Sequence, residues 1–201
     1  MTAATKAKSK KKTSKVKKKA RVLTPEQLVL LFEYADPWAD LYRLAYWAGC
    51  RCSEVRQLTA DAIQGENVII MQTKTSAEKR LPIDEMIAPV LKRLPSAGYL
   101  FPSPTGNGDK PIGRTSIHNH LSELAADLEL NSGSELDKVT THSFRRSRAT
   151  HLYKAKMMPV EICKITGHRS VEQLMEYIDI DTDEAAAKAA AITAAAFPGG
   201  F

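Results

Sequence analysis

One segment of this 201-residue sequence, from Asn67 to Ile83, changes from the spacing of amphipathic helices to short runs typical of strands. Within it, two short runs rich in β-branched residues, NVIIM and RLPI, flank the polar stretch QTKTSAEK, a pattern that predicts a β-hairpin with a mobile tip. Elsewhere the apolar residues recur at helical spacing, and no internal repeat is visible. The sequence therefore predicts a mainly α fold with one small antiparallel β-sheet, of the α+β class.

Helix boundary signals divide the rest of the chain. Thr24, Pro25 and Gln27 supply the N-cap, the first-turn proline and the capping-box partner of a first helix. Gly49 ends a second helix that starts near Asp36. Further helices are expected from about Ser53 through Leu58 and over residues 84–94, 115–128, 142–154, 159–166, 171–177 and 184–196, with NSGSELDK as a linker.

The positive charge is concentrated at the N-terminus. Residues 1–22 hold ten lysines and arginines and no acid, so the remaining chain has 19 basic against 23 acidic residues. Few apolar residues and strong self-repulsion predict a disordered basic tail over 1–22. Such a tail binds DNA phosphates through counterion release, without sequence specificity, and a solubilising role is the alternative. The tail residues expected to contact DNA are Lys10, Lys11, Lys12, Lys17, Lys18 and Lys19.

Length and composition exclude several classes of protein. A chain of this length holds one full core, and it has no apolar run that could form a membrane span or the core of a secretory signal. Its three cysteines, Cys50, Cys52 and Cys163, have the spacing of neither a disulfide framework nor a structural zinc site. We therefore expect free thiols, no metal site, no membrane partner and a cytoplasmic location.

Arginine and histidine fall at helical spacing in the stretch THSFRRSRATHL. His142 and Arg145 are three residues apart and share a helix face, so one ligand can meet both side chains. A guanidinium forks onto two phosphate oxygens, and an imidazole moves a proton near neutral pH. An isolated pair of this kind is more often a solvated basic face that touches DNA passively, and Arg146 and Arg148 fit that description.

Two further stretches carry weak signals. In GCRCSEV, Arg51 follows a helix terminator and precedes Glu54 by three residues, so the pair either orients the guanidinium from a buried position or lies on a solvated helix. In TGHRSVEQLMEYIDI, His168 directly follows a helix-ending glycine and Tyr177 lies nine residues later. A tyrosine in such a place is most often half-buried packing.

Order and spacing together make these signals strong. From Leu23 to Tyr177 the chain resembles the tyrosine recombinase (phage integrase) family. AGCRCSEVRQLTADAI resembles the first arginine box, TKTSAEKRLPI the lysine-bearing hairpin, and THSFRRSRATHL with ITGHRS the second box. Phe144 and Thr166 stand where leucine is commoner, and we expect Thr166 to affect packing more than chemistry. The matching positions, in order, are Arg51, Glu54, Lys74, His142, Arg145, His168 and Tyr177.

The resemblance implies a DNA breaking-rejoining fold and a cofactor-free strand transfer. Tyr177 would attack the scissile phosphorus and form a 3′-phosphotyrosyl bond that conserves the energy of the phosphodiester. Arg51 and Arg145 would hold the non-bridging oxygens, and His168 would hydrogen-bond the same phosphate.

The remaining roles concern protons and orientation. By the same resemblance, His142 would take the tyrosine proton, Lys74 would protonate the departing 5′ oxygen, and Glu54 would orient the site. Lys79 lies in the same hairpin and is the alternative to Lys74, although the TKT context favours Lys74. The other histidines, His118, His120 and His151, are expected to face DNA or to be structural.

The resemblance also implies an organisation and a function. We expect a catalytic domain over 23–182 and a C-terminal alanine-rich helix within 183–201 that docks on a neighbouring protomer or folds back on its own domain. We expect no counterpart here of the helical domain that precedes the catalytic domain in most members, as in short members that are little more than the catalytic domain.

The expected protein is a site-specific recombinase of bacterial, archaeal or phage origin, associated with the nucleoid. It would act on double-stranded DNA as a homotetramer, with a DNA-bending accessory protein as a further partner, and would integrate, excise or invert DNA. The alternatives are a topoisomerase of type IB and a catalytically silent DNA-binding module.

Overall fold

Residues 19–72, 77–105, 107–178 and 182–198 are described in a computed structural model of the chain. Of the positions expected to act, Lys74 and the tail lysines Lys10, Lys11, Lys12, Lys17 and Lys18 lie outside these ranges.

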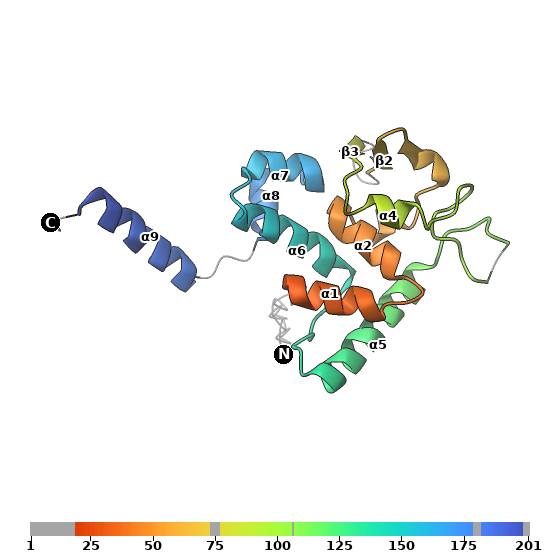
Figure 1. Cartoon of the computed structure of the whole chain (residues 1–201), viewed down its shortest axis with the longest axis horizontal. Helices are drawn as coiled ribbons and strands as arrows, with labels where there is room; N and C mark the ends of the chain where they lie inside the picture. The colour runs from red at the N-terminus through yellow and green to blue at the C-terminus, as the bar shows by residue number, and fades with distance from the viewer. Residues whose placement is uncertain (1–18, 73–76, 106, 179–181, 199–201) are drawn as a thin grey trace, which may run out of the picture.

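The elements follow one another as a mostly helical chain interrupted once by strands (Figure 1). The helices are α1 (Pro25–Tyr34), α2 (Ala39–Ala48), α3 (Cys52–Val55), α4 (Ala88–Leu91), α5 (Arg114–Ser132), α6 (Thr141–Lys154), α7 (Pro159–Thr166), α8 (Val171–Met175) and α9 (Thr182–Ala196). The strands are β1 (Ile63–Gln64), β2 (Asn67–Met71) and β3 (Glu78–Pro82), preceded by a 3-10 turn, η1 (Ala60–Ala62). The predicted mainly α class with one small antiparallel sheet is confirmed.

The sheet is antiparallel in the order β1-β2-β3. The predicted hairpin is present as β2 and β3, with Val68 opposite Leu81 and Ile70 opposite Lys79. The two-residue strand β1 was not predicted, because two residues are too few to show a period. In β3 the burial alternates so that Lys79 and Leu81 both face inward, which places a lysine against the core.

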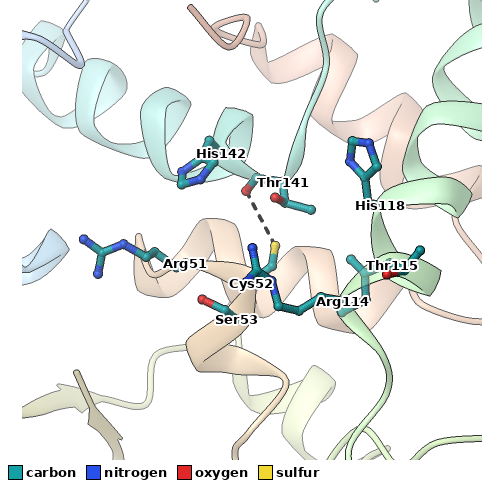
Figure 2. A pocket seen from close by; sticks show the side chains of 9 residues that line it. Arg51, Cys52, Ser53, Arg114, Thr115, His118, Thr141 and His142 are labelled. Atoms are coloured by element: carbon teal, nitrogen blue, oxygen red, sulfur yellow. Dashed lines mark hydrogen bonds between the residues drawn. The ribbon is translucent and has the colours of Figure 1, made fainter. Parts of the chain in front are cut away.

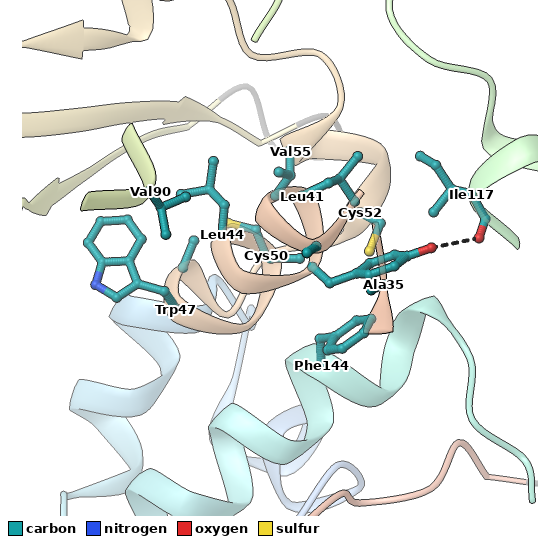
Figure 3. Packing of buried hydrophobic residues seen from close by; sticks show 14 of the residues in the cluster. Ala35, Leu41, Leu44, Trp47, Cys50, Cys52, Val55, Val90, Ile117 and Phe144 are labelled. Carbon is teal, nitrogen blue, oxygen red and sulfur yellow. Dashed lines mark hydrogen bonds between the residues drawn. The ribbon is translucent and has the colours of Figure 1, made fainter. Parts of the chain in front are cut away.

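The main core surrounds α2, which is buried on nearly every side. Leu41, Leu44 and Trp47 pack there with Val90 of α4 and Phe144 of α6 (Figure 3). Burying an aliphatic or aromatic side chain of this kind contributes about 1.5–3 kcal/mol. Because α2 ends at the turn that carries the first arginine, this core also fixes the backbone of the candidate site.

Capping residues and a proline explain why some helix ends lie where they were predicted and others do not. The capping box at the start of α1 is present, with Gln27 N–H donating to Thr24 Oγ1 over 3.3 Å. The second helix starts at Ala39 instead of near Asp36, since the residue before a proline, here Pro37, is disfavoured in a helix. In contrast, α5 continues through Ser132, into the predicted linker, before the glycine cap ends it.

A second, smaller core joins α6, α7 and α8. It consists of Ala149, Ile162, Leu174 and Ile178. These three helices lie together on one side of the molecule (Figure 1). They carry the segments that contain His168 and Tyr177, so this small core sets where those two side chains meet the rest of the site.

The ends of the described chain differ in how they contact the body. Arg21, expected in a disordered tail, instead forms ion pairs with Glu135, at 2.7 Å, and with Asp137. At the other end α9 lies apart from the main body (Figure 1), and its described side chains are exposed. None of the helices in the described part of the chain is long and apolar enough to cross a membrane.

Candidate active site

Arg51 is held in one orientation by Glu54. Gly49 ends α2 with φ of +58°, and the chain then enters α3 through Arg51. Glu54 Oε1 accepts a hydrogen bond from Arg51 Nη1 at 2.8 Å, and Oε2 accepts one from the Arg51 backbone N–H at 3.0 Å. Burial alone would raise the pKa of Glu54, but these hydrogen bonds and the arginine charge lower it below its usual value. The pair is therefore a buried carboxylate that orients a part-exposed guanidinium, not a solvated surface pair.

Arg145 is the most buried charge in the site, with 1% of its surface exposed. Its Nη1 donates to the carbonyl of Gly49 at 3.2 Å and to that of Thr166, so it ties α2 to the end of α7. Its Nε and Nη2 are buried and have no hydrogen-bond partner among the described residues. Burial, with the nearby Arg51, lowers the pKa of Arg145. Two unpaired buried donors beside a second guanidinium are costly and favour an anion as ligand.

His168 sits at the end of α7, where Gly167 adopts φ of +73°. The imidazole is 7% exposed, and its Nδ1 lies 2.6 Å from Thr166 Oγ1. Its Nε2 is buried without a partner in the described residues. Burial first, and then the charges of Arg145 and Arg51, lowers the pKa of His168 to about 3. The ring is therefore neutral at pH 7.

Tyr177 follows α8 between two buried anchors, Leu174 and Ile178. Its ring makes an edge contact with His168, with centroids 4.6 Å apart, and lies 5.8 Å from the guanidinium carbon of Arg145. The phenol is half-buried beside the unpaired donors. These contacts place the ring of Tyr177 at the candidate site, beside both His168 and Arg145.

Arg146 does not belong to a solvated basic face, so that expectation is wrong. The residue is 6% exposed, and its guanidinium donates to two carbonyls, that of Tyr177 at 2.8 Å and that of Ala20. Arg148 is half-buried, with its guanidinium 5.6 Å from the ring of Tyr46. Arg146 is buried because the chain at Ala20 and the segment after α8 at Tyr177 both lie against this side of α6.

His142 opens onto a surface hollow between α3, α5 and α6. The hollow has a volume of about 870 Å³ and is lined by Arg51, Cys52, Ser53, Arg114, Thr115, Ile117, His118, Thr141 and His142 (Figure 2). A neighbouring hollow shares His142, Arg114 and His118 and reaches Tyr177. Sequence reasoning missed Arg114, although its spacing of four residues from His118 at the start of a helix is the kind of signal that could have revealed it.

Most of the chain is similar to known proteins. The profile of the phage integrase family matches residues 21–184. The chain belongs to the phage integrase family. Among curated relatives, the integrase of Escherichia phage P2 is 28% identical over 173 residues, which cover 83% of this chain and 45% of that protein. Tyrosine recombinase XerC of Erythrobacter litoralis is 25% identical over 178 residues, which cover 80% and 56%.

Solved structures of integrases have a fold similar to that of this chain. The Tn1549 transposon integrase, in complex with a circular intermediate DNA, superposes with a TM-score of 0.72 at 19% identity, covering 87% of this chain and 67% of that one. A lambda integrase dimer bound to a COC′ core site gives 0.66 at 18% identity, covering 84% and 51%. The chain spans about half the length of the curated integrases and recombinases named above.

Of the two lysines considered as the proton donor to the 5′ oxygen, the structure describes Lys79 alone. Lys79 is 5% exposed, and its Nζ donates to the carbonyl of Ala48 and lies 3.1 Å from Cys50 Sγ. Burial lowers its pKa. Lys79 thus supports the turn that leads to Arg51. Lys74 lies outside the described residues and stays a prediction.

The hairpin nevertheless reaches the His168 turn. A Cβ on Gly167 would lie 1.9 Å from Nε2 of Gln72, the residue that precedes the undescribed stretch 73–76. The close approach, together with a left-handed φ, explains why glycine stands at this position. It also brings Gln72, the residue after β2, to the edge of the site.

Two other histidines are structural. His120 Nδ1 is 3.0 Å from the hydroxyl of Tyr42, and His151 Nδ1 is 2.9 Å from that of Tyr46. Burial lowers the pKa of His151. All three cysteines are free, and no group of three or more His, Cys, Asp or Glu side chains in the described residues is arranged to hold a metal ion.

Proposed function

We propose that this chain is the catalytic part of a site-specific recombinase that cleaves and rejoins DNA through a covalent 3′-phosphotyrosyl intermediate. One observation carries the proposal: the buried Arg145 keeps Nε and Nη2 unpaired next to the phenol of Tyr177. Unpaired donors in a site of low dielectric favour a group that gains negative charge during reaction. A phosphodiester attacked by a tyrosine is such a group.

In the proposed reaction, each step is carried out by one or two side chains. The oxygen of Tyr177 forms a bond to phosphorus as the bond to the 5′ oxygen breaks, and Arg51 and Arg145 stabilise the charge on the non-bridging oxygens. Lys74 supplies the proton that the 5′ oxygen takes up. The family resemblance assigns the tyrosine proton to His142 and a phosphate hydrogen bond to His168. Reversal with a 5′ hydroxyl from another duplex completes strand exchange.

The proposed partners follow from the family and from charge. The Tn1549 and XerH recombinases were solved with DNA, which supports double-stranded DNA as the substrate class here. We further propose a homotetramer in which α9 docks on a neighbouring protomer, tail lysines that hold DNA non-specifically, and a DNA-bending accessory protein. Relatives come from a phage and from bacteria, so we place the protein in the bacterial cytoplasm, acting on nucleoid DNA.

A covalent trapping assay on random DNA tests the proposal and identifies the target site at the same time. The protein is incubated with a pool of nicked duplexes of randomised sequence, and complexes that survive detergent are captured and sequenced. We expect enrichment of one related set of sites with the wild type and with the control Tyr34→Phe, whose phenol is exposed on α1. Tyr177→Phe should give none.

The alternatives predict different outcomes. DNA binding without any adduct from the wild type would refute the enzyme and favour a silent module. Adducts without site preference, combined with relaxation of an unrelated supercoiled plasmid, would favour a topoisomerase of type IB.

A further inference from the structure

The residues just before α1 are held against the body of the protein. The backbone N–H of Leu23 donates to Oγ of Ser147 on α6 at 2.8 Å, and Leu23 itself is fully buried. Two residues earlier, the backbone N–H of Arg21 donates to the carbonyl of Lys138 at 3.2 Å. These two bonds fix the path of the chain over residues 20–23, a segment that we call the N-terminal strap.

Arg21 fastens the N-terminal strap through its side chain as well. Its Nη2 lies 2.7 Å from Oε2 of Glu135, and its Nη1 binds Oδ1 of Asp137. Both carboxylates belong to the segment between α5 and α6. A single exposed ion pair contributes little to stability, but several charges joined in a network contribute more. Arg21 is therefore the side chain that holds the N-terminal strap on the body.

The N-terminal strap reaches Tyr177 through one side chain, that of Arg146. Nη1 of Arg146 donates to the carbonyl of Ala20, and its Nε donates to the carbonyl of Tyr177 at 2.8 Å. A guanidinium is planar and rigid, so the two carbonyls are held in a fixed geometry relative to each other. Lys19 and Ala20 also line the hollow that reaches Tyr177.

The backbone of Tyr177 lies just beyond a short helix. Since α8 ends at Met175, the carbonyl of Tyr177 is outside that helix, between the buried anchors Leu174 and Ile178. The backbone N–H of Tyr177 donates to the carbonyl of Leu174 at 2.8 Å, and Arg146 binds the carbonyl at the other end of the residue. Placement matters here, because a displacement of about 1 Å in a reacting group can slow a reaction about a hundredfold.

We propose that the N-terminal strap positions the nucleophile, with Arg21 and Arg146 as positioning residues. Arg21 holds the strap on the body, the carbonyl of Ala20 holds the guanidinium of Arg146, and Arg146 holds the carbonyl of Tyr177. This inference rests on the proposed function and deepens it. The segment next to the basic tail thus acts on the rate of cleavage, and not only on the affinity for DNA.

Cleavage at saturating protein separates positioning from DNA binding. In single-turnover cleavage of a nicked site identified by covalent trapping, we expect Arg21→Gln to lower the saturated rate about tenfold or more, with DNA affinity within about threefold. Arg21→Lys keeps a cation for Glu135 and Asp137 and should recover most of the rate. A lower affinity and a flatter salt dependence at an unchanged saturated rate would instead make Arg21 a phosphate contact and overturn the inference.

Arg93 provides the matched control. Its guanidinium forms two bonds with the carboxylate of Asp40, at 2.7 and 3.0 Å, and joins α2 to the segment after α4. Arg93→Gln removes the same charge as Arg21→Gln and a comparable ion pair, so it should cleave like the wild type. An equal loss of rate in both variants would contradict a specific role for the N-terminal strap.

A double variant tests whether Arg21 acts through Arg146. If it does, replacing Arg21 matters little once the guanidinium of Arg146 is gone. We therefore expect Arg21→Gln combined with Arg146→Met to cleave within about twofold of Arg146→Met alone. Two losses that multiply would show independent effects and refute this path to Tyr177.

A measurement without DNA keeps this inference separate from the proposed function. With fluorotyrosine incorporated at the six tyrosines of the full chain, Tyr177→Phe identifies the ¹⁹F signal of Tyr177. We expect that signal to move or broaden in Arg21→Gln and to stay as in the wild type in Arg93→Gln. An unchanged Tyr177 signal in Arg21→Gln would refute the inference alone. A wild type that forms no adduct on any site would refute the proposed function, whatever this signal shows.

Discussion

Replacing Arg146 should loosen the segment that carries the nucleophile. Its guanidinium donates to the carbonyls of Tyr177 and Ala20, and the side chain is almost fully buried. A hydrogen bond to a charged group contributes about 1.5–3 kcal/mol, so losing two of them in Arg146→Met should cost about 3 kcal/mol or more. If the whole loss lowers the free energy of local opening, the segment around Tyr177 opens roughly a hundredfold more often. Each 1.4 kcal/mol changes an equilibrium constant about tenfold.

Hydrogen exchange of single amides measures this directly. The reporters are the amides of Tyr177 and Ile178, which both donate to the carbonyl of Leu174, and that of Arg21, which donates to Lys138. In Arg146→Met both reporter groups should exchange up to about a hundredfold faster than in the wild type, because local unfolding sets their protection.

Arg43 provides the matched control. It also bonds a carbonyl, that of Phe32 at 2.9 Å, together with the carboxylate of Asp40, but it is farther from the site and partly exposed. Arg43→Met should lower overall stability by about 1 kcal/mol without selective exchange at Tyr177. If Arg146→Met and Arg43→Met change the Tyr177 amide equally, Arg146 is not an anchor of the nucleophile.

Three further outcomes follow from the structure. Glu54→Gln should lower stability in urea unfolding by about 2 kcal/mol at pH 7. Because the pKa of Glu54 is lowered by folding, this difference should shrink as the pH falls below about 4, and a constant difference would contradict the pairing with Arg51. Gly167→Ala should cost about 1–2 kcal/mol through its left-handed φ, and adding Gln72→Ala should recover only the part due to the clash. Deleting residues 2–18 should weaken DNA binding and flatten its salt dependence in anisotropy titrations while site choice is kept. A loss of site choice at an unchanged salt slope would contradict that role.

Local chemistry made much of the fold predictable. The capping box of Thr24 and Gln27, the hairpin and the bounds of α7 each depend on residues a few positions apart, and all three were predicted and are present. The order of the arginine, histidine and tyrosine motifs led to the phage integrase family, to which the chain belongs. The structure then brings Arg51, Arg145, His168 and Tyr177 together from four separate segments.

What could not be predicted depends on tertiary contacts. A basic run such as that on α6 is typical of a solvated face, yet Arg146 is buried because it binds the carbonyls of Ala20 and Tyr177, both distant in sequence. A lysine in an alternating strand is typical of a solvent-facing position, yet Lys79 Nζ is bound to the carbonyl of Ala48 beneath the site. The contacts of Thr166 with Ile162 and His168 could not be predicted either, since threonine and leucine positions look alike in a helical pattern.

The central claim is that Tyr177 becomes covalently bound to DNA. The direct measurement is mass spectrometry of the trapped adduct after digestion with protease and nuclease. The account predicts that the peptide containing Tyr177 carries the added mass of a nucleotide linked through its 3′ phosphate, and that the released strand ends in a 5′ hydroxyl. Nucleotide attached to another residue, or linked through a 5′ phosphate, would contradict it.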